Sequence, residues 1–198
     1  MAKKIKIGFL DTASKESGGI YQYSKSIFDS LNNNNNDYEL IKFSYKKDEK
    51  DSRLLKTTTG LTKYFYFIIL FIRASFKLLP RDFEDIDLFL SPYSALAPHI
   101  FLRKKFIFTL HDLQEKYYPE NFSFKERLLR QIRNYVLLKQ CMFVICESES
   151  VKNDIEKFFK IHQSKIVVMP SPPPKSIYNQ ENKFDQLLLD KEYGLNRD

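Results

Sequence analysis

The residues best suited to chemistry in this chain stand directly after short apolar runs, and the first of them are His111 and Asp112. This pair follows the run FIFTL at residues 106–110. A histidine can hydrogen-bond a hydroxyl or phosphate oxygen, and it can move a proton near neutral pH. A purely structural histidine is the alternative interpretation of His111. The histidines, cysteines and carboxylates show no grouping typical of metal ligands, so we expect no metal site.

A pair of glycines, Gly18 and Gly19, follows the apolar run IKIGFL at residues 5–10 and opens a predicted helix. Glycine lets a ligand approach the backbone closely, and the free N–H groups of a helix start attract a phosphate. The surrounding residues form neither a GxGxxG motif nor a Walker motif. The pair therefore fits either a phosphate-binding turn or an ordinary tight turn, and the sequence leaves both open.

Short apolar runs that alternate with longer periodic segments must position these residues. The predicted strands cover residues 5–10, 39–43, 86–90, 106–110, 142–146 and 166–169, and the predicted helices cover residues 20–31, 61–79, 124–139 and 148–159. Such alternation predicts an α/β fold with a Rossmann-like, doubly wound parallel sheet. Ligands of such sheets bind at the loops after the carboxyl ends of the strands. Tyr93 and Glu147 also stand at such positions.

Composition narrows the class of protein further. A length of 198 residues predicts one domain, and 43% hydrophobic residues suffice for a sizeable core. The net charge of +7 favours anionic partners, but no nucleic-acid-binding motif is present, so we expect no nucleic acid partner. Cys141 and Cys146 lie in one predicted strand whose length of roughly 16 Å separates them too far for a disulfide. Free buried thiols and the lack of a signal peptide predict a cytoplasmic protein.

The predicted helix 61–79 combines an apolar body with a basic stripe. Its basic residues, with one that flanks it, are Lys63, Arg73, Lys77 and Arg81, and they share one sector of about 100°. Such a helix can lie on an anionic membrane surface, which would make the protein peripheral on the cytoplasmic face. A core helix with a solvated basic stripe is the alternative. The helix at 124–139 also has a basic face.

Four segments, taken in order, resemble family 4 glycosyltransferases. They are IKIGFL with the following GGIY, then FIFTLHDLQEKYYPENFSFKERLLRQIRNY, then VICESESVKNDIEKFF, and finally KIVVMPSPPP. The resemblance spans residues 5–174, and the second segment is its most specific part. It implies a GT-B fold, in which an N-terminal Rossmann-like domain binds the acceptor and a C-terminal domain binds the sugar nucleotide. Residues 1–174 correspond to the first domain, and residues 175–198 to a linker or docking tail.

The resemblance also implies roles for individual residues. Gly18 and Gly19 would approach the donor diphosphate or the acceptor. His111 would face the donor sugar and act as the catalytic residue by orienting and stabilising it. Tyr21, Tyr93 and Asp112 complete the expected substrate-binding set. The family retains anomeric configuration without a metal, so no cofactor is expected beyond the nucleotide-sugar donor, which the absent C-terminal domain would hold.

These features predict the acceptor-side half of a retaining, hexosyltransferase-type glycosyltransferase. Its partners would be a C-terminal donor-binding domain or subunit and a lipid-linked or polysaccharide acceptor, in the biosynthesis of cell-envelope polysaccharides. We expect the chain alone to be inactive, because the donor-binding residues are missing. The alternative is a non-catalytic membrane-docking or acceptor-presenting subunit of a split glycosyltransferase.

Overall fold

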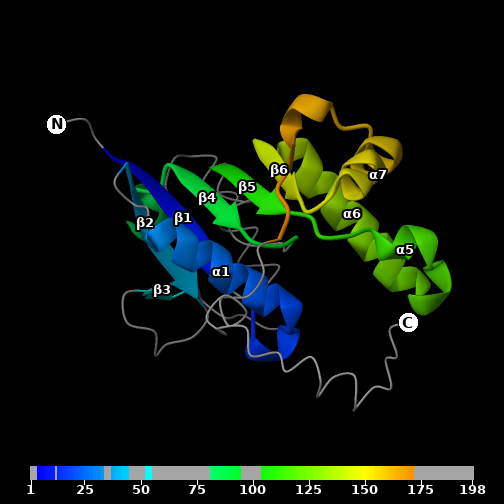
Figure 1. Ribbon diagram of the computed structural model, residues 1–198, viewed down its shortest axis with the longest axis horizontal. Helices are drawn as coiled ribbons and strands as arrows, with labels where there is room; N and C mark the ends of the chain where they lie inside the picture. The colour runs from blue at the N-terminus through cyan, green and yellow to red at the C-terminus, as the bar shows by residue number, and fades with distance from the viewer. Residues whose placement is uncertain are drawn as a thin grey trace, which may run out of the picture.

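The computed structural model describes residues 4–11, 13–33, 37–44, 52–54, 81–94 and 104–171. Within these residues, seven strands form one parallel sheet in the order β3-β2-β1-β4-β5-β6-β7 (Figure 1). The strands are β1 Ile5–Asp11, β2 Tyr38–Ser44, β3 Ser52–Leu54, β4 Leu88–Ser91, β5 Lys105–Thr109, β6 Phe143–Cys146 and β7 Ile166–Val168. The order reverses between β1 and β4, which confirms the predicted α/β, doubly wound, Rossmann-like sheet.

Helices connect the strands. The α-helices are α1 Gly19–Asn33, α3 Arg81–Glu84, α5 Gln114–Tyr117, α6 Phe124–Gln140 and α7 Glu149–Phe159, and the 3-10 turns are η1 Lys15–Ser17, η2 Pro119–Asn121 and η3 Gln163–Lys165. The chain moves one way across the sheet through α1 and the opposite way through α6 and α7. Because crossovers between parallel strands are right-handed, α1 covers one face of the sheet, and α6 and α7 cover the other.

The edge strand β3 is an element that the sequence pattern did not predict. β3 pairs with β2 over three residues only, from Ser52 opposite Lys42 to Leu54 opposite Ser44. Such a short, polar edge strand lacks the apolar run by which the other strands were predicted. The sheet is therefore one strand wider than expected.

The predicted helix 61–79 lies outside the described residues, and so do Lys63, Arg73 and Lys77. Arg81 begins the short helix α3. None of the helices in the described ranges is long and apolar enough to cross a membrane. The expected membrane contact through Lys63, Arg73, Lys77 and Arg81 stays a prediction.

The starts of α6 and α7 are set by serine caps. Ser123 and Glu126 form a capping box, in which the Ser123 hydroxyl accepts from the Glu126 N–H at 3.3 Å and a Glu126 carboxylate oxygen accepts from the Ser123 N–H at 2.9 Å. The Ser123 hydrogen bonds lower the pKa of the Glu126 carboxyl. Ser148 caps α7 by accepting from the Val151 N–H.

Phenylalanine packing holds the middle of the sheet together. The fully buried phenylalanines of the strands are Phe9, Phe43, Phe89, Phe106 and Phe108. Gly8 of β1 faces two of them, and a Cβ atom placed on it would lie 2.7 Å from the ring of Phe89 and 3.0 Å from that of Phe43. Position 8 therefore has room for glycine only, because the two rings already occupy the space that a side chain needs.

We predict that Gly8→Ala lowers the free energy of unfolding by about 1–3 kcal/mol, because the added methyl group overpacks the phenylalanine cluster. Urea denaturation followed by circular dichroism measures this change. Gly19→Ala is the matched control: no atom lies within 4 Å of its Cβ position, so its stability should equal or slightly exceed that of the wild type. Equal stability of the two variants would contradict the proposed packing constraint.

Both cysteines are free and buried, which confirms the prediction that they form no disulfide. Cys146 ends β6, whereas Cys141 lies outside the strand, at the C-cap of α6. Burial raises the pKa of the Cys141 thiol to about 11 and also raises the pKa of the Cys146 thiol. The nucleophilic thiolate is therefore scarce at neutral pH in the folded protein.

We predict that the folded protein resists alkylation by iodoacetamide at pH 8, whereas the protein unfolded in guanidinium is labelled at both Cys141 and Cys146. The raised pKa keeps the thiols protonated, and burial keeps the reagent away. Mass spectrometry after short labelling times measures the difference. Rapid labelling of either cysteine in the folded protein would show that its surroundings are more open than the structure indicates.

Candidate functional site

The carboxyl ends of β1, β4, β5 and β6 meet at one edge of the sheet, where the strand order reverses (Figure 1). In doubly wound sheets a crevice forms at this edge, because the connections from neighbouring strands leave in opposite directions. The loop to α1 follows β1, Pro92 and Tyr93 follow β4, His111 and Asp112 follow β5, and Glu147 follows β6. Three of these four connections meet at the side chain of His111.

The protein holds the His111 ring at both of its nitrogens. Nε2 donates to the backbone carbonyl oxygen of Pro92 at 3.0 Å, and Nδ1 lies 3.2 Å from Oε2 of Glu147. The carbonyl of Pro92 can only accept, so Nε2 carries the hydrogen. The side chain is 19% exposed, which leaves part of the ring open to the edge of the sheet. His111 therefore ties the loop after β4 to the loop after β6.

The side chain of Tyr23 extends this arrangement to α1. Its ring packs edge-to-face on that of His111, with 4.9 Å between the ring centroids. Its hydroxyl lies 3.3 Å from Oγ1 of Thr109, the last residue of β5. Burial raises the pKa of the Tyr23 phenol, although the hydrogen bond to Thr109 opposes this shift. Tyr23 thus stays neutral and anchors the first turns of α1 beside His111.

The two glycines lie at the start of the same helix. Gly18 has a left-handed φ of +56°, which favours glycine, and the helix begins at Gly19. Both residues are exposed, no atom lies within 4 Å of either Cβ position, and the first turn of α1 contains no acidic residue. The space at this helix start would admit an anion, and the backbone N–H groups there carry a partial positive charge, which the exposed carboxylate of Glu16 in η1 opposes.

The other expected substrate-binding residues are Tyr93, Tyr21 and Asp112. Tyr93 is half-buried after β4, and its backbone carbonyl accepts from the Ser91 hydroxyl at 2.8 Å. Tyr21 is half-buried in the first turn of α1, and Asp112 is exposed beside His111. Asp112 accepts from the Gln114 N–H at 3.4 Å, at the start of α5. Roles of these residues in substrate binding stay predictions.

Sequence reasoning missed Tyr23 and Thr109, and it marked Glu147 only as a residue that follows a strand. Tyr23 stands four residues after Gly19, one helical turn on, so its position beside the helix start was available from the spacing. That its ring would contact His111 was not, because the two residues are 88 positions apart in the sequence.

Asp11, the last residue of β1, is occupied within the protein. Its carboxylate pairs with Lys42 at 2.8 Å and accepts from the Ser24 hydroxyl at 3.1 Å. These contacts join β1 to β2 and α1. No group of three His, Cys, Asp or Glu side chains that could hold a metal ion occurs in the described part of the chain.

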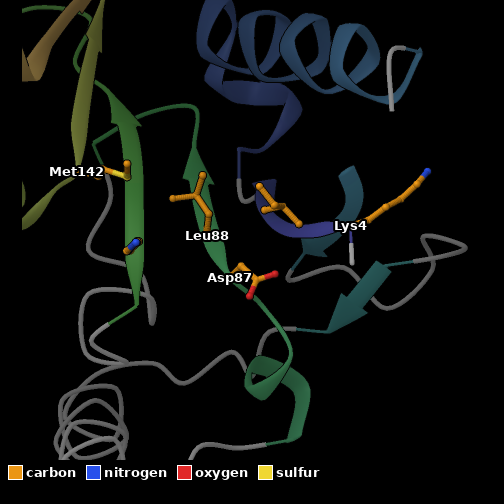
Figure 2. A pocket seen from close by; sticks show the side chains of 6 residues that line it. Lys4, Asp87, Leu88 and Met142 are labelled. Atoms are coloured by element: carbon orange, nitrogen blue, oxygen red, sulfur yellow. The ribbon is translucent and has the colours of Figure 1, made fainter. Parts of the chain in front are cut away.

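A depression of about 410 Å³ lies at the opposite edge of the sheet (Figure 2). Its lining residues are Lys4, Ile5, Asp87, Leu88, Lys105 and Met142. They stand at or just before the amino ends of β1, β4, β5 and β6, so the depression is separated from His111 by the length of the strands. The depression therefore lies at the opposite end of the strands from His111.

The comparisons with known proteins agree with this geometry. The profile of Glycosyltransferase Family 4 matches residues 17–172. The chain belongs to Glycosyltransferase Family 4.

A solved structure shares the fold of this Family 4 domain. A glycosyltransferase from Rickettsia africae ESF-5 aligns with a TM-score of 0.50 and 16% identity, over 100% of this chain and 51% of its own. An α-glucosyltransferase in complex with UDP and a 13-mer DNA containing an HMU base aligns with a TM-score of 0.44 and 12% identity, over 86% of this chain and 43% of its own. No curated protein matches the sequence significantly. This Family 4 chain thus spans about half the length of the Rickettsia glycosyltransferase.

We predict that His111→Ala lowers the free energy of unfolding by about 1–3 kcal/mol, because it removes two polar contacts and one ring contact that join three connections. Thermal and urea unfolding measure the loss. His162→Ala is the control, since His162 is exposed and contacts only Ser164 within its own turn. A His111 variant as stable as the control would show that the ring is not an anchor.

Proposed function

We propose that this domain is the acceptor-side half of a retaining glycosyltransferase that works with a C-terminal donor-binding domain or subunit. The observation that carries the proposal is the carboxyl edge of the sheet in a Family 4 domain, where His111 contacts Pro92, Glu147 and the Tyr23 ring of α1, the helix that begins at Gly19. The N–H groups at Gly18 and Gly19 would stabilise a phosphate of the donor or of a lipid-linked acceptor. The nucleotide sugar itself would be held mainly by the donor-binding half.

His111 would act in this enzyme as an orienting and stabilising group. Its two ring nitrogens are engaged by Pro92 and Glu147, which makes the ring suited to a fixed position near the donor sugar rather than to moving protons freely. Glu147 would balance the charge of the ring when both nitrogens carry a hydrogen. A preorganised polar group of this kind stabilises charge that develops in a transition state without having to reorganise.

The acceptor side of the proposal rests on surface chemistry. The net charge of +7 favours a phosphorylated or membrane-borne acceptor over a neutral one. Tyr21 in the first turn of α1 and Tyr93 after β4, both half-buried, would contact the acceptor. The class we propose is a lipid-linked or polysaccharide acceptor at the cytoplasmic face of the membrane, in the biosynthesis of the cell envelope.

We predict no measurable transfer from labelled nucleotide sugars by the chain alone, and transfer when it is joined to the C-terminal domain of a Family 4 glycosyltransferase. In the joined enzyme, His111→Ala should lower the rate roughly 10²–10³-fold per folded molecule, the cost of losing a preorganised polar contact. Thin-layer chromatography of labelled products measures both, and His162→Ala should retain the wild-type rate.

Three results would count against this proposal. Robust turnover by the chain alone would show that no donor-binding half is needed. A joined enzyme that folds but transfers none of a broad panel of sugars would favour a non-catalytic, acceptor-presenting subunit. A His111→Ala enzyme with normal turnover per folded molecule would leave His111 as a structural anchor only.

A further inference from the structure

The outward face of α6 is apolar, which is unusual for a helix on the surface of a soluble domain. Five large apolar side chains on it are about half exposed or more: Phe124 (73%), Leu128 (48%), Leu129 (54%), Ile132 (52%) and Tyr135 (52%). At 100° per residue these five fall within an arc of about 140° on one side of the helix. We call this surface the α6 apolar face.

The opposite side of α6 carries the residues that pack on the protein. Leu137 and Leu138 are buried in the core, and Asn134 is buried with them. Two arginines also lie on this side and are half-buried: Arg127 and Arg130. Apolar groups therefore occupy both sides of the helix, and only one of the sides is covered by this domain.

The arginines of α6 are turned toward neighbouring residues of the protein. Arg130 stacks over the Phe122 ring at 4.6 Å and lies 3.7 Å from the buried carboxylate of Glu115. Arg133 is partly buried, and this desolvation lowers the pKa of its guanidinium. The arginines of the basic face expected for residues 124–139 are thus turned largely toward the domain itself. The contact of Arg130 with Glu115 joins α6 to α5.

Lysines replace the arginines on the outward side. Lys125 and Lys139 are exposed, and on the helical wheel both fall inside the arc of the α6 apolar face. The Nζ atom of Lys139 lies 5.6 Å from the centre of the Tyr135 ring. Glu126, the acidic residue of α6, is engaged in the capping box with Ser123. The apolar face is therefore accompanied by positive charge at both ends of the helix.

We propose that α6 is an interfacial helix that lays its apolar face on an anionic lipid surface. Burying the five side chains in the acyl boundary removes apolar area from water. Lys125 and Lys139 can reach the phosphate headgroups from the same face, while Phe124 and Tyr135 suit the depth at which aromatic rings gather. The surface is separate from the crevice at His111 and does not depend on glycosyl transfer.

Charge favours lipid over a second copy of the chain. In a two-fold contact of antiparallel α6 helices, Lys125 of one copy would approach Lys139 of the other, and these like charges would repel. An anionic surface instead attracts both lysines at once. Each lysine near such a surface adds to the attraction, and salt screens it. A lipid surface therefore satisfies the apolar and the charged groups of this face together.

Co-sedimentation of the 198-residue chain with vesicles tests the proposal. We expect binding to vesicles of phosphatidylcholine with 30% phosphatidylglycerol, and much weaker binding to phosphatidylcholine alone or in high salt. Leu128→Glu with Ile132→Glu should reduce binding at least about 10-fold, because two carboxylates would enter the acyl boundary. Val167→Glu is the matched control, since Val167 is a comparably exposed apolar residue on the edge strand β7.

A fluorescence measurement locates the contact, because the chain contains no tryptophan. In a Phe124→Trp variant, the single indole should shift its emission to shorter wavelength when anionic vesicles are added. In a Val167→Trp variant the emission should stay unchanged. Thermal unfolding without lipid should be close to that of the wild type for each variant, because all of the substituted side chains are exposed.

Several outcomes would overturn the proposal. They are equal binding to neutral and anionic vesicles, no binding at all, or undiminished binding by the Leu128→Glu, Ile132→Glu variant. Loss of binding on charge reversal at Arg73 and Lys77 alone would place the contact on the predicted helix 61–79 instead. An emission shift of Phe124→Trp that follows protein concentration without lipid would make this face a contact between copies of the chain.

Discussion

The contact of Gly8 with the rings of Phe89 and Phe43 is the constraint on which the rest of this structure depends. It lies where β1 pairs with β2 on one side and with β4 on the other. The absence of a side chain at position 8 lets the two rings fill the centre of the sheet. This packing therefore holds β1 beside β2 and β4 at the point where the strand order reverses and the connections leave in opposite directions.

His111 holds the loops at the carboxyl edge of the sheet in fixed positions. Its ring holds the loop after β4 and the loop after β6, and Tyr23 adds α1 to the same cluster. The open turn at Gly18 and Gly19 thus begins a helix that the contact of Tyr23 with His111 holds in place. Such an arrangement suits catalysis, because groups that are already oriented need no reorganisation when charge develops.

The basic residues of α6 lie in two environments, the arginines against the domain and the lysines on its outward side. Its arginines are used inside the fold, where Arg130 stacks on Phe122 and lies near Glu115. Arginine suits this role because its planar group combines ring stacking with hydrogen bonding. The lysines remain on the outward side, among exposed apolar residues. A domain that docks on a membrane through α6 would present its site to lipid-borne substrates in a limited range of orientations.

Local sequence pattern determined most of the fold. Six of the strands, all except β3, are three to seven residues long and follow apolar runs in the sequence. Periodic segments separate several of these runs. These patterns depend on neighbours in the sequence, so the alternation of strand and helix, the position of His111 after a strand and the position of Gly18 before a helix followed from them. The short polar strand β3 carried no such pattern.

Only the tertiary structure decided which side chains meet. The contact of His111 with Glu147, Pro92 and Tyr23 joins residues far apart in the chain, and no local spacing encodes it. The outward face of α6 was likewise hidden, because apolar residues occur on both sides of the helix and the sequence does not say which side the core covers. Periodicity shows that a face exists, whereas burial depends on the elements that pack against it.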